Sequence, residues 1–433
     1  MSQALIDALI AGTLSDPDGG APLQVATRSV VIEPSLEDAE GEVVKPLQLG
    51  RHFAVVSDPI THEILGARVE HALNGLGYVS RILLTGRPHP DEETVQRIRA
   101  AAASADALVA VGSGTINDLC KYAGAQDGKP YIVFPTAPSM NGYTSVNAAI
   151  TIHGHKKSLT AQAPLGVFID LSILSAAPAR MIRSGLGDSL CRPTAQADWL
   201  LAHLLLNQPY RTMPFALLAE DEGQLFASSQ ALLEGDIEAM AALVRTLLLS
   251  GFGTAICGSS QPASQGEHLI SHFVDMFGDP SWPESFHGEQ IGVTTLMMAR
   301  LQERMLDGIP PVLHPSGADE EEFVRRYGES LGRSCWTEFV DKRLEGERLS
   351  RARERIADSW DAIRNTIASV TKPWELLADV LRLAGAPTTH DDLGWPRAFS
   401  ERAIRHARDI RSRYTFLDLA ADSGRLEPIA ALL

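Results

Sequence analysis

Val109-Ala110-Val111-Gly112-Ser113-Gly114-Thr115-Ile116-Asn117-Asp118-Leu119 is the stretch that decides the fold. Its first three residues are apolar, which favours a buried strand, and the residues after Gly-Ser-Gly are typical of the start of a helix. Glycines at such a turn let the backbone approach a pyrophosphate, whose charge is favoured by free N–H groups at a helix N-terminus. The stretch therefore predicts a nucleotide-binding α/β unit, with a plain strand-to-helix turn as the alternative.

The glycine pattern departs from the ordinary dinucleotide fingerprint at two places. Asn117 stands where the third glycine of Gly-x-Gly-x-x-Gly would be. Asp58, the carboxylate that would bind a ribose hydroxyl, follows an earlier strand and does not lie roughly twenty residues downstream. The chemistry of each piece suits a dinucleotide, but the arrangement is not the usual Rossmann one.

Short β-branched runs alternate with helical stretches through the first 180 residues. This alternation implies βαβ units and a mainly parallel sheet. A hairpin is expected at residues 148–160, and helices at 60–76 and 92–104. The predicted strands cover residues 52–57, 79–84, 107–111, 131–134 and 166–169.

Beyond residue 178 the pattern changes to helical periodicity with almost no β-branched alternation. We therefore expect an α/β dinucleotide-binding domain over residues 1–180, followed by an all-helical metal- and substrate-binding domain over residues 181–433. The clearest helices are predicted at residues 197–206, 237–249, 345–370 and 397–419.

Composition excludes several classes of protein. The 433 residues include 45% hydrophobic and 21% charged residues, as in globular proteins, and the net charge of −16 argues against non-specific nucleic-acid binding. Residues 1–20 lack the basic start of a secretory signal. Residues 239–258 are apolar but interrupted by Arg245, Gly251 and Gly253, so we expect a buried helix running into a loop and no membrane span. A cytoplasmic protein follows.

The four cysteines are scattered, without a Cys-x-x-Cys pair, which argues against a structural zinc finger and against a disulfide scaffold. They are Cys120, Cys191, Cys257 and Cys335.

Three histidines form the strongest candidate for a chemical site. His268 and His272 are four residues apart, on one face of a helix, and His287 follows fifteen residues later. Singly, each is more often an ordinary core or surface residue, but the trio favours a metal site, which needs three protein ligands and an open position. Asp188 follows Gly185-Leu186-Gly187, which we expect to form a flexible turn, and is either an anionic third ligand or a helix N-cap.

A polar loop follows the strand at residues 131–134. Residues 134–145 contain several hydroxyl side chains, two prolines and a glycine, which suits a rigid loop beside a ligand. A merely polar surface loop has the same composition.

In their order and spacing these segments resemble the glycerol-1-phosphate dehydrogenase family. This family is a branch of the superfamily that also holds glycerol dehydrogenase, the iron-dependent alcohol dehydrogenases and 3-dehydroquinate synthase. The resemblance runs from about residue 51 to residue 419, which leaves about fifty N-terminal residues outside it. It is strongest at residues 112–118, 135–140, 187–188, 262–272, 287–290 and 410–415.

The resemblance implies one divalent metal ion, usually zinc, with nickel and iron also accepting such ligands. The motif matches place its ligands at Asp188, His268 and His287. His272 then becomes a pocket residue one helical turn away, on the substrate side. The resemblance also implies a homo-oligomer with an α/β domain followed by an all-helical domain, the dehydroquinate synthase-like fold.

The resemblance also implies a nicotinamide cofactor, NAD or NADP, and Asp58 at the adenosine ribose would favour NAD. Lys156 or Lys157, in the predicted hairpin, would supply charge for a phosphate, although a solvated turn explains them equally well. The residues expected at the cofactor are Asp58, Gly112, Ser113, Gly114, Thr115, Asp118, Thr136, Ser139 and Ser145.

The activity implied is interconversion of a small phosphorylated polyol and its ketone, sn-glycerol 1-phosphate and dihydroxyacetone phosphate. The metal would polarise the ketone oxygen while hydride passes from the nicotinamide. Two departures bear on this. Asn141, counted among the catalytic residues, stands where the family usually has an acidic residue, and residues 189–194 lack the Lys and Tyr that relatives often carry around the Thr.

Three alternatives remain open at this point. One is a dehydrogenase of another polyol or alcohol. Another is a lyase like 3-dehydroquinate synthase, against which stands the lack of a Gly-Gly-Lys in the loop after Ser145. The third is a catalytically silent relative, which Asn141 keeps open.

Overall fold

The computed structural model describes residues 2–152 and 155–433, which form two compact units. The first unit comprises Met1–Ser189 and Thr212–Ser260, and the second comprises Leu190–Arg211 and Gln261–Leu433. These units differ from the single boundary predicted after residue 180, because residues 190–211 group with the second unit and residues 212–260 with the first. Which segments fold on their own is a separate property, so that boundary stays a prediction.

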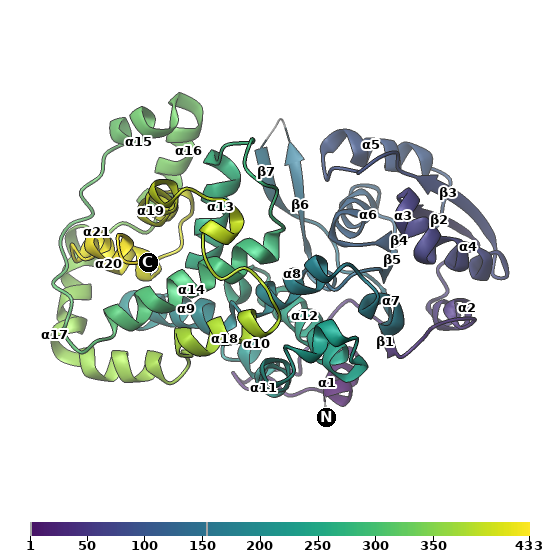
Figure 1. The fold of residues 1–433 in the computed structure, drawn as a ribbon, viewed down its shortest axis with the longest axis horizontal. Coiled ribbons are helices and arrows are strands. Elements are labelled where there is room, and N and C mark those ends of the chain that lie inside the picture. Colours follow the sequence, from purple (N-terminus) through teal and green to yellow (C-terminus); the bar gives the residue numbers. More distant parts are fainter. Residues whose placement is uncertain (1, 153–154) are drawn as a thin grey trace. The chain divides into compact units, whose positions relative to one another are not determined.

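A six-stranded sheet is the centre of the first unit (Figure 1). Its order is β1-β8-β5-β4-β2-β3, and every pairing is parallel. Parallel strands with helices on both faces are buried on both sides, which is why the central strands at residues 107–112, 131–135 and 166–170 are nearly continuous apolar runs. The strands are β1 (Ser29–Glu33), β2 (His52–Ser57), β3 (Tyr78–Leu83), β4 (Ala107–Gly112), β5 (Tyr131–Pro135) and β8 (Gly166–Asp170).

The five predicted strands are confirmed to within one residue at either end. The edge strand β1 was not predicted, although its Ser-Val-Val-Ile-Glu sequence pairs along its full length with β8. The predicted hairpin is confirmed as the antiparallel pair β6 (Asn147–Ile152) and β7 (His155–Thr160). His153 and Gly154 lie outside the described residues, and so do the side chains of His155 and Lys156.

Helices cover both faces of this sheet. Phe53, Val55 and Val109 pack with Leu65 and Val69 of the segment after β2 in one buried cluster. On the opposite face a Cβ built at Gly124 of α6 would lie 3.5 Å from Leu108. The helices of the first unit include α1 (Ser2–Ile10), α2 (Glu40–Val44), α3 (Pro59–Thr61), α4 (Ala67–Asn74), α5 (Glu92–Ala101), α6 (Gly114–Asp127) and α7 (Leu171–Ser175).

The helices of the first unit correct two sequence expectations. The helix predicted over 60–76 is divided, because a π-helical turn, His62–Gly66, separates α3 from α4. Residues 185–187 are not a flexible turn but part of α8, so Asp188 is in the last turn of a helix and is not an N-cap. The remaining helices of this unit are α8 (Ala179–Ser189), α10 (Met213–Ala216), α11 (Ala219–Ala227) and α12 (Ile237–Cys257), with short 3-10 turns at Lys45–Leu47 and Ala231–Glu234.

One helix within the described residues, α12, is long and apolar enough to cross a membrane by length and composition. Its most apolar window is 72% buried inside the structure, as expected for a core helix. The helix also continues through Gly251 and Gly253, where the sequence predicted a loop.

The second unit is built from helices around one large apolar core. The helix predicted over 397–419 is broken into α19, a 3-10 turn and α20, with Thr415 capping α20 by accepting from the Leu417 N–H. The helices are α9 (Arg192–Leu206), α13 (Gly266–Phe277), α14 (His287–Met305), α15 (Glu320–Tyr327), α16 (Glu329–Val340), α17 (Gly346–Ala368), α18 (Trp374–Leu383), α19 (Arg397–His406), α20 (Phe416–Asp422) and α21 (Leu426–Ala430). The 3-10 turns of this unit are Gln261–Ala263, Asp391–Leu393 and Ala407–Ile410.

Candidate active site

The glycine turn lies between the buried end of β4 and the start of α6. A Cβ at Gly112 would come within 2.6 Å of Ile116, which leaves no room for a side chain, and one at Gly114 would come within 2.8 Å of the Met140 sulfur, which would have to move. Ser113 precedes the helix in an extended conformation and makes no side-chain capping hydrogen bond. The first-turn N–H groups of α6, including that of Thr115, point toward the helix N-terminus, as at an anion-binding turn.

Asp118 and Ser145, two of the expected cofactor residues, contact a lysine that the sequence analysis did not single out. Lys121 is fully buried, and its Nζ donates to the Gly142 carbonyl at 2.5 Å, to Ser145 Oγ at 3.1 Å and to the Asn147 carbonyl at 2.9 Å. Its ion pair with Asp118 measures 3.6 Å. Lys121 therefore ties α6 to the polar loop and to the base of the hairpin.

The same carboxylate is engaged on both oxygens. Asp118 accepts from the Asn117 amide at 3.1 Å and from the Ala149 N–H at 3.0 Å. Burial raises the pKa of Asp118 and lowers that of Lys121, and the attraction between the two charges opposes both shifts. In this structure both side chains hold the scaffold around the glycine turn, and a direct role at the cofactor stays a prediction.

The polar loop is held by close backbone packing against two helices of the first unit. A Cβ at Gly185 in α8 would lie 1.7 Å from the Pro138 carbonyl oxygen, and one at Gly251 in α12 would lie 2.2 Å from Thr144 Oγ1. Thr144 itself donates to the Leu248 carbonyl at 2.6 Å. Glycine at these helical positions lets the loop approach both helices, which a larger residue would prevent.

Three of the expected residues lie along this loop. Thr136 is buried, and its N–H donates to the Gly112 carbonyl at 3.2 Å, which joins the loop to the glycine turn. The Ser139 carbonyl accepts from Ser184 Oγ at 3.1 Å. Asn141 donates its backbone N–H to Asp188 Oδ2 at 2.8 Å, and its side-chain amide to Ser250 Oγ at 3.2 Å. Asn141 thus orients the carboxylate that the motif match assigned to the metal.

Asp58 follows β2, at the carboxyl edge of the sheet, where ligands of parallel sheets bind. Its Oδ1 accepts from the N–H groups of Ile60 and Thr61, both at 2.9 Å, and so caps α3. The carboxylate is half-buried, and a role at a ribose remains a prediction beside this capping role.

The three histidines lie together in the second unit. His268 and His272 are on α13, and His287 is the first residue of α14. The ring centroids of His268 and His287 are 5.2 Å apart, those of His268 and His272 are 6.0 Å apart, and those of His272 and His287 are 6.2 Å apart. The helical spacing and the start of the next helix thus bring three imidazoles to one place.

Two buried carboxylates meet at the start of α13. Glu267 Oε1 lies 2.9 Å from His268 Nδ1 and accepts from the Gln265 N–H at 2.7 Å. Asp198 accepts from the Gly266 N–H at 2.9 Å, and burial followed by the charge of Glu267 raises the pKa of Asp198 to about 8. A Cβ at Gly266 would come within 2.8 Å of Asp198 Oδ2, so glycine is needed here.

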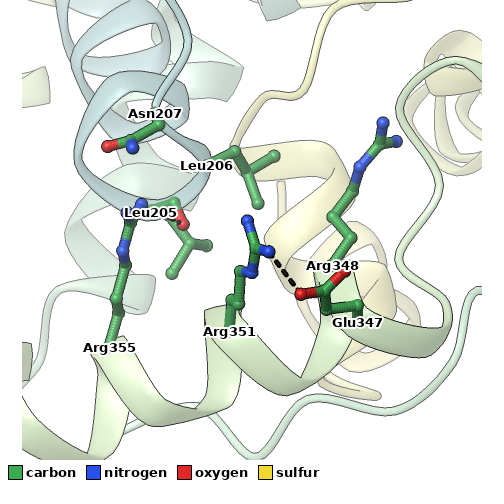
Figure 2. Close-up of a pocket in the computed structure, with 7 residues that line it drawn as sticks. All are labelled: Leu205, Leu206, Asn207, Glu347, Arg348, Arg351 and Arg355. Carbon is green, nitrogen blue, oxygen red and sulfur yellow. Dashed lines mark hydrogen bonds and ion pairs between the residues drawn. The ribbon is translucent and has the colours of Figure 1, made fainter.

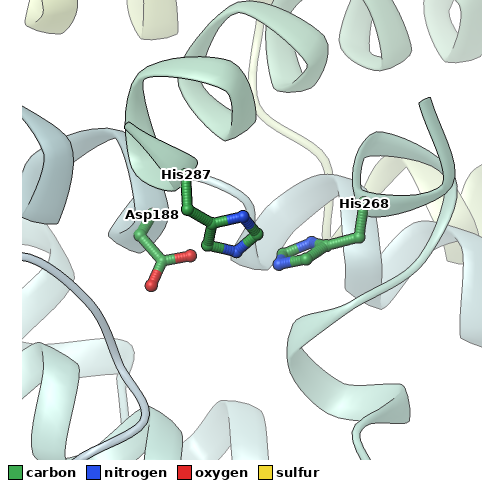
Figure 3. Close-up of side chains that lie close together, drawn as sticks. All are labelled: Asp188, His268 and His287. Atoms are coloured by element: carbon green, nitrogen blue, oxygen red, sulfur yellow. The ribbon is translucent and has the colours of Figure 1, made fainter. Parts of the chain in front are cut away.

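Figure 3 draws the three side chains that the motif matches assign to a metal ion: Asp188 of the first unit, and His268 and His287 of the second. One carboxylate and two imidazoles form a donor set of the kind that holds zinc and related divalent ions. Within the second unit, Cys191, Glu267 and His268 also each offer a ligand atom, and these three atoms lie within 4.8 Å of one another. His268 is common to both groups.

The chain is similar to known proteins over nearly its whole length. The model of the iron-containing alcohol dehydrogenase family matches residues 31–178. A glycerol-1-phosphate dehydrogenase [NAD(P)+] from Bacillus subtilis is 28% identical over 415 residues, which cover 94% of each chain. One from Pyrococcus horikoshii is 33% identical over 307 residues, which cover 69% of this chain and 87% of that one.

The chain belongs to the glycerol-1-phosphate dehydrogenase family. Among solved structures, glycerol dehydrogenase from Schizosaccharomyces pombe covers 96% of this chain and 92% of its own, with a TM-score of 0.63 and 16% identity. A similarity at this identity bears on the fold, and it confirms the expected α/β sheet domain with a helical remainder. The family resemblance predicted from the motifs is likewise confirmed.

One hollow in the surface of the second unit is not part of the expected site. A hollow of about 220 Å³ in the second unit is lined by none of the expected site residues (Figure 2). Arg355, on its wall, donates to the carbonyls of Leu204 and Leu205 at the end of α9, and Arg351 pairs with Glu347. These arginines are occupied in capping a helix and in a surface ion pair.

Three residues that contact the expected site residues or their backbone were missed by the sequence analysis. Lys121 follows Asp118 by three residues, a spacing that places a cation and a carboxylate on one helix face. Glu267 directly precedes His268, and an acidic neighbour of a candidate ligand is a recognisable signal. Asp198 had no such signal, because only the fold brings α9 to the start of α13.

Proposed function

We propose that this protein is a metal-dependent, NAD(P)-linked oxidoreductase that interconverts sn-glycerol 1-phosphate and dihydroxyacetone phosphate. The observation that carries the proposal is the pair of imidazoles, His268 and His287, whose ring centroids lie 5.2 Å apart in a chain of this family, with Asp188 added by its motif match. The relatives from Bacillus subtilis and Pyrococcus horikoshii are both named glycerol-1-phosphate dehydrogenase [NAD(P)+], which supports the substrate and the cofactor.

In this proposal Asp188, His268 and His287 hold one divalent ion, with zinc, nickel and iron all compatible with the ligands. When bound, the ion supplies Lewis-acid polarisation of a carbonyl or hydroxyl oxygen. The chain orients the ligands itself. The Asn141 N–H fixes one oxygen of Asp188, and Glu267 engages His268 Nδ1.

The cofactor is proposed to bind at the glycine turn. The first-turn N–H groups of α6, between Ser113 and Thr115, would hold the pyrophosphate, and Gly112 and Gly114 permit its close approach. Asp58 would accept from ribose hydroxyls, and its charge would disfavour the 2′-phosphate of NADP. Thr136 and Ser139 line the next loop, and we place Asp118 and Ser145 beside Lys121 as the support of that loop.

His272 and Asn141 are proposed to contact the substrate. The imidazole of His272 stacks at 20° to that of His287, which puts a titratable group beside the ligands. Asn141 has an amide in place of the usual acid, so it can donate to a substrate oxygen but cannot exchange a proton. A proton that enters or leaves the substrate would then pass through another group, for which His272 is our candidate.

The deciding experiment uses purified, metal-reconstituted protein with dihydroxyacetone phosphate and NADH or NADPH. Loss of absorbance at the nicotinamide band is expected, together with stoichiometric metal that Asp188→Ala protein fails to retain. No turnover with any phosphorylated or free polyol would contradict the proposal. Conversion of a phosphorylated substrate without net NADH consumption would favour the lyase alternative. Full activity in metal-free protein would overturn the ligand assignment. Cytoplasmic location, a homo-oligomeric state and the lack of a nucleic-acid partner stay predictions from the sequence.

A further inference from the structure

We infer that Glu267 is a positioning residue for His268, whose carboxylate holds the imidazole in the tautomer and orientation that present Nε2 to a divalent ion. The inference rests on the proposed function, since it takes His268 to be a metal ligand. Glu267 itself touches neither metal nor substrate in this account. It acts through the ring of its neighbour.

The hydrogen bonds of Glu267 define the tautomer of His268. Glu267 is fully buried, and its Oε1 lies 2.9 Å from His268 Nδ1. Glu267 Oε1 is an acceptor, since it also accepts from the Gln265 N–H, so the facing Nδ1 carries the proton and the lone pair stands on Nε2. Metal-binding histidines usually make this kind of contact through the ring nitrogen that does not bind the metal, and the contact also increases the basicity of the ligand.

The surroundings of Glu267 hold its carboxylate in place. Its Oε1 also accepts from the Gln265 N–H at 2.7 Å, at the N-terminus of α13, where the helix dipole favours a negative charge. The Arg413 guanidinium, which donates to the Ser264 carbonyl, adds an attractive charge. Glu267 is therefore fixed on the His268 side by contacts that do not involve the metal site.

Glu267 could instead be a ligand, because Cys191, Glu267 and His268 also lie within 4.8 Å of one another. The hydrogen bonds favour the positioning role. Glu267 Oε1 already accepts from Gln265 and His268, and Oε2 lies 3.4 Å from Thr194 Oγ1. The Cys191 thiol is directed to the Ala263 carbonyl at 3.7 Å. A shift of the metal to this group would break these contacts.

The test compares Glu267→Gln with Asp198→Asn in the full-length protein. Both changes alter a buried acceptor at the start of α13, but only Glu267 contacts His268. The zinc dissociation constant is measured on metal-free protein by competition with a chromophoric chelator, beside the melting temperature. We expect Glu267→Gln to bind zinc about 10- to 100-fold more weakly, as is typical when such a partner of a ligand is lost. For Asp198→Asn we expect a change within about threefold, as for a substitution outside the ligand's contacts.

Equal zinc affinity in Glu267→Gln and unmodified protein would overturn the inference, and so would equal weakening in both variants. Cobalt-substituted protein provides a spectroscopic check. We expect no near-ultraviolet thiolate band, whereas a band that disappears in Cys191→Ser would identify the second group as the site and overturn the positioning role.

These readouts are independent of turnover. Selective weakening in Glu267→Gln would support the inference even if no polyol were a substrate. Turnover of dihydroxyacetone phosphate with unchanged zinc affinity in Glu267→Gln would leave the function standing and remove the inference.

Discussion

Gly185→Ala is the substitution whose outcome the structure predicts against ordinary expectation. In the interior of an exposed helix this change stabilises by about 1 kcal/mol, because alanine has the higher helix propensity. Gly185 lies in α8, where an added Cβ would come 1.7 Å from the Pro138 carbonyl oxygen. Real Cβ contacts essentially never fall below 3.0 Å, so helix or loop must move by at least 3.0 − 1.7 = 1.3 Å.

This displacement sets the size of the expected effects. Overpacking a filled site costs roughly 1–3 kcal/mol, and the atom struck here is backbone, which cannot rotate away. With about 3 kcal/mol for this rigid backbone contact, less about 1 kcal/mol for helix propensity, we expect a net loss of about 2 kcal/mol in the free energy of unfolding. Asp188 follows on the same helix and accepts from Asn141 of the displaced loop, and a misplacement of about 1 Å in a catalytic constellation can lower turnover roughly 100-fold.

The matched control is Gly223→Ala in α11, also in the first unit. A Cβ there would meet nothing within 4 Å. We expect this variant to be more stable by roughly 0.5–1 kcal/mol, with unchanged turnover. Stability is measured by urea unfolding and activity by reduction of dihydroxyacetone phosphate. If Gly185→Ala is as stable and active as Gly223→Ala, the argument from close packing of α8 on the loop is wrong.

Three further predictions concern single carboxylates and the buried lysine. Asp58→Ala should lower the free energy of unfolding by about 1 kcal/mol, because the cap of α3 is lost. It should also lower the preference for NADH over NADPH in steady-state kinetics, and an unchanged preference would show that Asp58 is not at the cofactor site. Lys121→Met should lower the free energy of unfolding, measured in urea, by about 3–5 kcal/mol, because Asp118 is left buried without its cation. Adding Asp118→Asn should restore part of that loss, and strictly additive losses would contradict a coupled pair. Because the pKa of Asp198 is raised to about 8 in the folded protein, the folded state holds a proton that the unfolded chain loses, and stability falls as pH rises from about 4 to about 8. Asp198→Asn should flatten this dependence of stability on pH. An identical dependence in both proteins would show that Asp198 is not its source.

Most of the first unit was predictable because its signals are local. Buried parallel strands are continuous apolar runs, and the residues of β2, β4 and β8 met this pattern closely. The edge strand β1 was missed because it lies outside the alternating βαβ segments, and only its pairing with β8 makes it a strand. Asp188 was read as following a turn because Gly185 and Gly187 suggest flexibility. Close packing against the loop, rather than flexibility, is the reason for glycine at 185.

The sequence by itself determined the alternation of strands and helices, the glycine turn at residues 112–114, and the family from which the proposed metal ligands are assigned. These features depend on local spacing and on motifs, which can be recognised in the sequence alone. The tertiary structure alone decided which atoms support the site. Lys121 binds the loop and the base of the hairpin through three contacts that are 21 to 26 residues away in the chain, and Asp198 meets the start of α13 across 68 residues. Contacts over such separations depend on how helices pack, and no local pattern encodes them.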